Sequence, residues 1–113
     1  MANEEKQLLI KALCGYLPYG VIMFSSSKEK TYTLTPITLN NLIISENEYI
    51  EDRPYLRPMS SMTEEELEEY ENVRDDYYDD LKTYDWLNAH HFDYRGLIEK
   101  GLALEAPKDM YKF

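Results

Sequence analysis

The sequence predicts a single α+β domain spanning residues 1–113. The expected order is an N-terminal helix, a small antiparallel sheet of three or four strands, then a long acidic helix and a helical C-terminal segment packed on one sheet face. Apolar residues recur at helical spacing near both ends of the chain, whereas the middle alternates between apolar and polar residues as strands do. The length of 113 residues and the hydrophobic content of 43% suit one modest core.

Residues 4–14 are expected to form the first helix. Asn3 is a suitable N-cap, and Gly15 supplies a stop signal. The apolar stripe of this helix consists of Leu8, Leu9, Ala12 and Leu13. Cys14 lies on the apolar side, so we expect a buried and unreactive thiol. Because it is the only cysteine, a disulfide within the chain is excluded.

The expected sheet begins with a hairpin whose strands are residues 19–24 and 30–34, joined by a polar turn. A third strand is expected at 42–44, where apolar and β-branched residues follow a turn signal. Residues 49–56 form either a fourth strand or the exit from the sheet. Pro54 and Pro58 favour an edge position or an extended segment there, since proline lacks the N–H that a central strand donates.

The long acidic helix is expected over residues 64–82. Thr63 and Glu66 form a capping box at its start. Its apolar stripe, with steps of three and four residues, is expected to face inward. The stripe consists of Leu67, Tyr70, Val73, Tyr77, Leu81 and Tyr84.

The other faces of this helix are rich in carboxylates. The main ones are Glu64, Glu65, Glu68, Glu69, Asp75, Asp76, Asp79 and Asp80. One interpretation is a mimic of nucleic-acid phosphates that occupies a basic DNA-binding groove on another protein. The other is a solvated helix face that needs no partner. Repulsion between carboxylates at this spacing costs only a few tenths of a kcal/mol per pair, so packing tolerates it without selection for function.

Residues 85–104 are expected to be helical in two pieces. Asp85 is a suitable cap for a helix over 86–91, and Asp93 for a helix over 94–100. Aromatic and leucine residues in this part supply a second apolar set for the core.

The formal net charge of −10 limits the choice of partners. It repels the phosphates of nucleic acids and of anionic membranes, so direct binding to either is not expected. A protein partner remains open, and a basic one would match the charge; solubility alone also accounts for a charge of this size. No apolar run is long enough for a signal peptide or a membrane span, so a cytoplasmic location is expected.

We find no pattern that indicates catalytic, cofactor-binding or metal-ligating residues. His90 and His91 are adjacent, and neighbouring residues on a helix point about 100° apart, so both rings cannot easily reach one ion. The four glycines are isolated from one another, so no phosphate-binding loop is present. No cofactor is expected.

The segment 55–62 joins the expected sheet to the acidic helix and has two interpretations. It is either a recognition loop or a proline-fixed crossover whose methionines fill gaps beneath the helix. Arg57, Trp86 and Tyr94 are candidate anchors for a partner, because aromatic residues and arginine dominate interface hot spots.

Two stretches resemble a known family. They contain the motifs LRPMSSMTEEE, within residues 54–66, and DWLNAHHFDYRGLIEKGLALEAP, at residues 85–107. Together with residues 17–21, they resemble a family of small uncharacterised proteins encoded in phages, prophages and mobile elements of gut Bacteroides and related bacteria. The resemblance implies a bacterial or phage origin and an accessory role, and no activity or catalytic residue.

The leading functional prediction is a non-enzymatic protein-interaction module, an adaptor or inhibitor from a phage or mobile element. The first alternative is an acidic DNA-mimic inhibitor of a nucleic-acid enzyme. The second is a small enzyme of unknown chemistry, which would need a deep polar pocket around His90 or His91.

Overall fold

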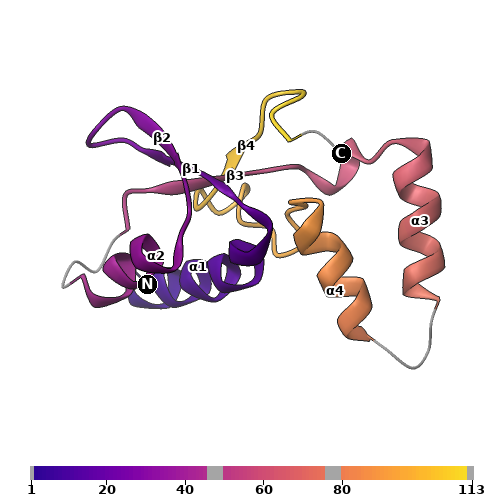
Figure 1. Cartoon of the computed structure of the whole chain (residues 1–113), viewed down its shortest axis with the longest axis horizontal. Helices are drawn as coiled ribbons and strands as arrows, with labels where there is room; N and C mark the ends of the chain where they lie inside the picture. The colour runs from indigo at the N-terminus through magenta and orange to yellow at the C-terminus, as the bar shows by residue number, and fades with distance from the viewer. Residues whose placement is uncertain (1, 46–49, 76–79, 112–113) are drawn as a thin grey trace.

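The computed structural model describes residues 2–45, 50–75 and 80–111 and has an α+β fold, as predicted (Figure 1). In chain order, its elements are α1 (Ala2–Tyr16), η1 (Leu17–Tyr19), β1 (Ile22–Ser25), β2 (Lys30–Thr33), α2 (Pro36–Ile44), β3 (Arg53–Leu56), η2 (Met59–Ser61), α3 (Glu64–Arg74), α4 (Asp80–Ala89) and β4 (Leu104–Glu105). Within the described ranges, no helix combines the length and apolar character needed to cross a membrane.

Helix α1 confirms the first predicted helix but extends past both expected ends. Asn3 therefore lies inside the first turn and is not the N-cap, and Gly15 lies inside the last turn. A Cβ on Gly15 would lie 3.1 Å from side-chain atoms of Asn88, so glycine at this position lets α1 and α4 approach closely. The chain turns away only after η1, at Gly20, whose φ of 72° favours glycine.

The expectation of a buried Cys14 is wrong, because its side chain is exposed. The face of α1 that enters the core consists of Leu9, Ala12, Leu13 and Tyr16. Cys14 follows this face by one residue, about 100° around the helix, and so points outward.

The described strands form one four-stranded sheet in the order β2-β1-β3-β4. The β1–β2 hairpin is confirmed, with Ile22 opposite Thr33. Strand β3 pairs antiparallel to β1, but β4 pairs parallel to β3, with Tyr55 opposite Leu104. The sheet is therefore mixed and not wholly antiparallel. A parallel neighbour needs a long connection, and the segment that contains α3 and α4 supplies it.

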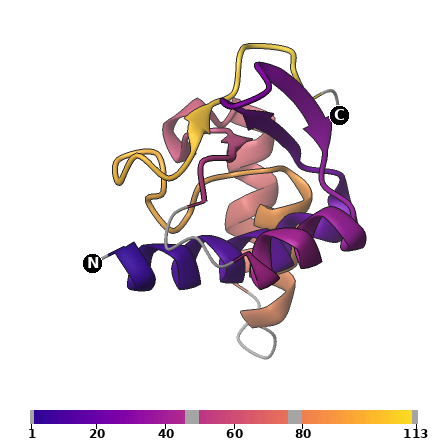
Figure 2. The same ribbon diagram turned by 90° about the vertical axis from the view of Figure 1, so that its left-hand side faces the viewer.

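The third strand expected at 42–44 is wrong, because these residues end helix α2. Thr35 caps this helix in a capping box with Thr38, and Pro36 occupies its first turn. These start signals outweigh the β-propensity of the apolar residues that follow. In Figure 2, α2 lies beside α1 beneath the strands.

A strand within residues 49–56 is confirmed as β3, although Tyr49 lies outside the described residues. The edge position is wrong, since β3 lies between β1 and β4. Pro54 is tolerated there because the pairing with β4 begins at Tyr55, one residue further on. Its missing N–H therefore removes no bond from that ladder.

The predicted capping box is confirmed at the start of α3. A single helix over 64–82 is wrong, because α3 ends at Arg74 and a second helix, α4, begins at Asp80. Residues 76–79, with Tyr77 of the expected stripe, lie outside the described part of the chain. Figure 1 shows α3 and α4 side by side, with α3 farthest from the sheet.

The inward-facing stripe of the acidic helix is confirmed only in part. Tyr70 and Val73 are half-buried, but Leu67 is 46% exposed, Leu81 73% and Tyr84 50%. Helix α3 packs against α4, and α4 packs against α1 and η1, instead of both covering a sheet face. A helix hairpin offers less surface than a sheet, which leaves part of the stripe in water.

The C-terminal segment has turns where a helix was expected over 94–100. The Asp93 carboxylate accepts hydrogen bonds from the backbone N–H groups of Leu97 (2.8 Å) and Ile98 (2.9 Å), so it caps a turn. The helix expected over 86–91 is confirmed only for residues 86–89, the end of α4, because His90 and His91 lie in a turn. Helix α4 runs through Asp85 without a cap there.

The core lies between the sheet and the helices α1 and α2, and C-terminal residues complete it. Its members are Leu9, Ala12, Leu13, Tyr16, Val21, Met23, Leu34, Leu39, Ile50, Leu56, Leu97, Leu102 and Ala103. The C-terminal segment therefore packs on the core as expected, although it does so with turns.

Candidate functional site

Arg57 is held by a bidentate ion pair at the start of α3. Its two terminal nitrogens lie 2.8 and 2.6 Å from the Glu66 carboxylate oxygens. Their side chains are only 17% and 12% exposed. The hydrogen bond from Arg57 lowers the pKa of Glu66 below its usual value. The same carboxylate accepts from the N–H of Thr63, so the capping box and the ion pair share one side chain.

Arg57 also lies over the ring of Phe92, with 4.2 Å between the guanidinium carbon and the ring centroid. Phe92 stacks on Trp86 at 5.7 Å, and Trp86 stacks on His90 at 4.1 Å. The structure thus brings together two predicted anchors, Arg57 and Trp86. We call Arg57, Glu66, Trp86, His90 and Phe92 the Arg57 cluster.

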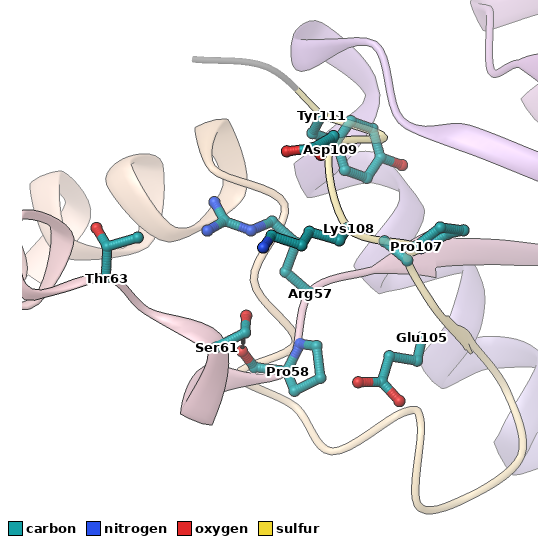
Figure 3. A pocket seen from close by; sticks show the side chains of 10 residues that line it. Arg57, Pro58, Ser61, Thr63, Glu105, Pro107, Lys108, Asp109 and Tyr111 are labelled. Atoms are coloured by element: carbon teal, nitrogen blue, oxygen red, sulfur yellow. Dashed lines mark hydrogen bonds between the residues drawn. The ribbon is translucent and has the colours of Figure 1, made fainter.

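A cavity of about 410 Å³ adjoins this cluster, between the crossover after β3 and the C-terminal segment (Figure 3). Pro58, Ser61 and Thr63 line one side, and Glu105 and Lys108 line the other. The Ser61 hydroxyl donates to the backbone oxygen of Pro58. The segment 55–62 is thus held by local contacts and also lines a cavity, which fits both interpretations of it.

Tyr111 also lines this cavity, and its hydroxyl connects strands β1 and β3. Its hydroxyl accepts from the N–H of Ile22 (2.9 Å) and donates to the carbonyl of Tyr55 (2.7 Å). Burial raises the pKa of Tyr111 to about 12. The ring stacks on His91, with centroids 3.8 Å apart. The C-terminal segment is therefore fastened to β1, β3 and the loop after α4 at one residue.

His91 is buried, and one ring nitrogen lies 2.9 Å from the carbonyl oxygen of Tyr19. Burial lowers the pKa of His91 from 6.5 to about 4. The folded protein therefore binds this proton more weakly than the unfolded chain does. The stability that His91 contributes is present above pH 6.5 and is lost as the pH falls toward 4.

We predict that the free energy of unfolding falls by about 3 kcal/mol more in the parent protein than in His91→Asn as the pH is lowered from 6.5 to 4. Asparagine does not titrate, and it tolerates the positive φ of 60° at this position. Urea denaturation of both proteins at several pH values measures the difference. Equal pH dependence in the two proteins would contradict the burial of a neutral imidazole.

Both histidines are engaged in packing contacts with aromatic rings. A ring nitrogen of His90 lies 2.8 Å from the carbonyl oxygen of Trp86, and its ring is stacked. Neither His90 nor His91 lines the cavity at Arg57. In the ranges that the structure describes, no three His, Cys, Asp or Glu side chains are grouped as metal ligands would be.

The third predicted anchor, Tyr94, belongs to a different surface. Its ring lies 5.5 Å from Tyr84 and 6.3 Å from Tyr16, and its hydroxyl donates to Asn88 (3.0 Å). An open hollow of about 560 Å³ lies here between α1 and α4. We call it the α1–α4 hollow; it is lined by Lys11, Leu81, Tyr84, Asp85, Asn88, Tyr94 and Arg95.

The predicted acidic face lies in water wherever the structure describes it. Its exposed members are Glu64, Glu65, Glu68, Glu69, Asp75 and Asp80, whereas Asp76 and Asp79 lie outside the described residues. Glu64, Glu68 and Asp75, together with Glu71, recur every three or four residues and so share one side of α3. Exposure fits both interpretations of these carboxylates.

Sequence reasoning missed three contributors to these surfaces, namely Leu81, Arg95 and Tyr111. Leu81 was assigned to the buried stripe by its spacing, which cannot reveal that α3 and α4 separate. Arg95 lies directly beside a predicted anchor, Tyr94, and that adjacency was the available signal. Tyr111 lies in a tail without periodicity, so no pattern could indicate its contacts.

Comparisons of the chain with protein-family models, with curated proteins and with solved structures find no match. The Arg57 cluster is largely buried and its groups bind one another, as expected of a structural element. The α1–α4 hollow instead exposes Lys11, Leu81, Tyr84 and Asp85, and the carboxylates on the acidic side of α3 are also exposed.

Proposed function

We propose that the protein is a non-enzymatic interaction module, an adaptor or inhibitor of phage or mobile-element origin that acts in the bacterial cytoplasm. The observation that carries this proposal is the exposure of Leu81 and Tyr84, at 73% and 50%, one turn apart on α4. Both line the α1–α4 hollow beside Tyr94. The resemblance of its motifs to phage and mobile-element proteins supports the accessory role.

Apolar groups in this arrangement favour a protein partner. Scattered exposed leucines are common on soluble proteins, but an apolar cluster beside a hollow is typical of binding surfaces. Burying the largely exposed side chain of Leu81 in an interface would contribute about 1.5–3 kcal/mol, and burying the half-exposed Tyr84 would contribute less. Tyr84 already rests on Tyr94, so part of the surface is ordered before a partner binds.

The test is capture of binding proteins from Bacteroides cells that carry the element, with quantitative mass spectrometry. We expect at least one protein to be captured by the parent chain and lost with Leu81→Glu and with Tyr84→Glu. Both positions are exposed, so the substitutions should leave the fold intact, which circular dichroism checks. Ile37→Glu is the matched control, because Ile37 is 76% exposed on α2. Capture that is unchanged in both α4 variants would reject this surface.

A second candidate function, a DNA-mimic inhibitor, is favoured by the acidic side of α3. Glu64, Glu68 and Glu71 are exposed and stacked along the helix, with a rise of about 6 Å for every four residues. A basic nucleic-acid enzyme would bind this row through charge, and its affinity would fall steeply with salt.

The triple variant Glu64→Gln, Glu68→Gln and Glu71→Gln separates this function from the first. It should weaken the binding of a basic partner and flatten the salt dependence, without affecting binding at Leu81. A control variant of equal charge replaces three exposed carboxylates elsewhere, at Glu4, Glu5 and Glu51. Equal effects of the two triple variants would mean that only net charge matters.

A further inference from the structure

The α1–α4 hollow has a charge opposite to that of the protein as a whole. The chain carries a net charge of −10, yet two cations, Lys11 and Arg95, line this hollow against one carboxylate, Asp85. Among the described residues, neither cation has an ion-pair partner. An acidic protein has many carboxylates that could neutralise these two groups, and none of those described does.

Arg95 is the stronger indication of the two. Its guanidinium carbon lies 4.9 Å from the centroid of the Tyr94 ring, which places the cation beside the aromatic wall of the hollow. One terminal nitrogen is shielded from solvent and finds no hydrogen-bond acceptor in the described part of the chain. Arg95 lines the hollow, so an anion there would form charge-assisted hydrogen bonds with the accessible part of its guanidinium.

The remaining walls of the hollow are apolar. Leu81 and Tyr84 are exposed on the α4 side, and Tyr94 continues this surface toward Arg95. The Tyr94 hydroxyl is occupied by its hydrogen bond to Asn88. A ligand that satisfies both parts of the hollow therefore carries an anionic group next to an apolar group.

The net charge of the protein favours a monoanion. The charge of −10 repels an approaching phosphate dianion more strongly than it repels a carboxylate. The planar guanidinium also matches a carboxylate in two-point pairing. The hollow is open to solvent, so the last residue of a polypeptide chain can enter it.

We propose that the α1–α4 hollow binds the C-terminal carboxylate of a partner polypeptide that ends in an apolar or aromatic residue. Arg95 and Lys11 pair with the carboxylate, and Leu81, Tyr84 and Tyr94 cover the terminal side chain. This inference rests on the proposed function, since it names the chemistry of the partner at the same surface.

The test is a titration of the full ¹⁵N-labelled chain with a pentapeptide, Ala-Gly-Ser-Leu-Phe, as the free acid and as the C-terminal amide. We expect saturable shifts of the amide resonances of Tyr84, Asn88 and Arg95 with the free acid. The amidated peptide should bind at least about tenfold more weakly, because it lacks the charge-assisted hydrogen bonds. No partner from the host is needed, so failure here is separate from failure of the capture experiment.

Three variants locate the interaction. Arg95→Gln should lower the affinity for the free-acid peptide at least about tenfold. Lys11→Gln should lower it by a smaller factor, since Lys11 is exposed. Because Lys11 is exposed, its substitution should leave the fold intact, so that variant remains informative if Arg95→Gln perturbs folding. Lys100→Gln, an exposed lysine outside the hollow, is the control and should bind as the parent does.

Equal binding of the acid and the amide would overturn the proposal, as would the absence of saturable shifts at up to about 20 mM peptide. An amidated peptide with an internal glutamate before the phenylalanine tests an acidic side chain as the source of the carboxylate. Binding as tight as that of the free acid would overturn the choice of a chain end. Displacement of the free acid by equimolar inorganic phosphate would overturn selection for a carboxylate.

Discussion

Replacing Glu66 with glutamine is expected to lower the free energy of unfolding by about 3 kcal/mol. The substitution keeps the size of the side chain and a carbonyl oxygen for the N–H of Thr63, but removes the charge that pairs with Arg57. Arg57 then stays in a site that is only 17% exposed, without its carboxylate. We place the loss at the low end for buried pairs, because water still reaches part of both side chains.

Urea denaturation at neutral pH measures this loss, and Glu65→Gln is the matched control. Glu65 is the preceding residue on α3 and is exposed, so its substitution should change stability by no more than about 0.5 kcal/mol. If Glu66→Gln lowered the free energy of unfolding no more than Glu65→Gln does, the Arg57 cluster would not hold the crossover to α3.

Phe92→Ala is expected to lower the free energy of unfolding by about 4 kcal/mol. Phe92 is fully buried, supports Arg57 through its ring face and stacks on Trp86. Its backbone also forms the bridge to Arg57 that joins the C-terminal segment to the crossover. Alanine would leave a cavity where these three parts of the fold meet.

Phe92→Leu and Tyr84→Ala are the controls for this substitution. Leucine retains most of the volume and should recover more than half of the loss. Tyr84 is half exposed, so removing its ring should cost far less than removing Phe92. Equal losses at positions 84 and 92 would contradict a core that closes around Phe92.

Local signals in the sequence predicted those elements whose ends are fixed by neighbouring residues. The capping box of Thr63 and Glu66 located the start of α3, and the polar turn located the β1–β2 hairpin. In each case the deciding contacts lie within a few residues of one another. The α+β class followed from the same periodicities.

The errors arose where tertiary contacts decide between local alternatives. Gly15 suggests a helix end from the sequence, but it lies inside α1, where the close approach of Asn88 favours a residue without a side chain. The apolar residues at 42–44 suit a strand or a helix, and the packing of α2 on α1 adds to the start signals at Thr35 and Pro36 in favour of the helix. The parallel pairing of β4 depends on a return of the chain that no short pattern encodes.

The candidate anchors were predicted from their residue types alone, and the structure shows which of them lie together. Arg57 and Trp86 meet, but in a cluster whose interactions are internal. Tyr94 lies at the α1–α4 hollow, where Leu81 and Arg95 supply the apolar and charged parts that the sequence did not reveal. Burial and side-chain partners distinguish residues that stabilise the fold from residues that can contact another protein. Both properties are known only from the structure.

Site-specific photocrosslinking tests the proposed binding surface most directly. The photoreactive residue p-benzoylphenylalanine is placed at Leu81, at Tyr84 or, as a control, at Ile37, in chains expressed in the host cell. We predict that the two α4 positions crosslink to the same protein and that position 37 does not. Adducts that form equally at all three positions, or only at Ile37, would contradict binding through α4.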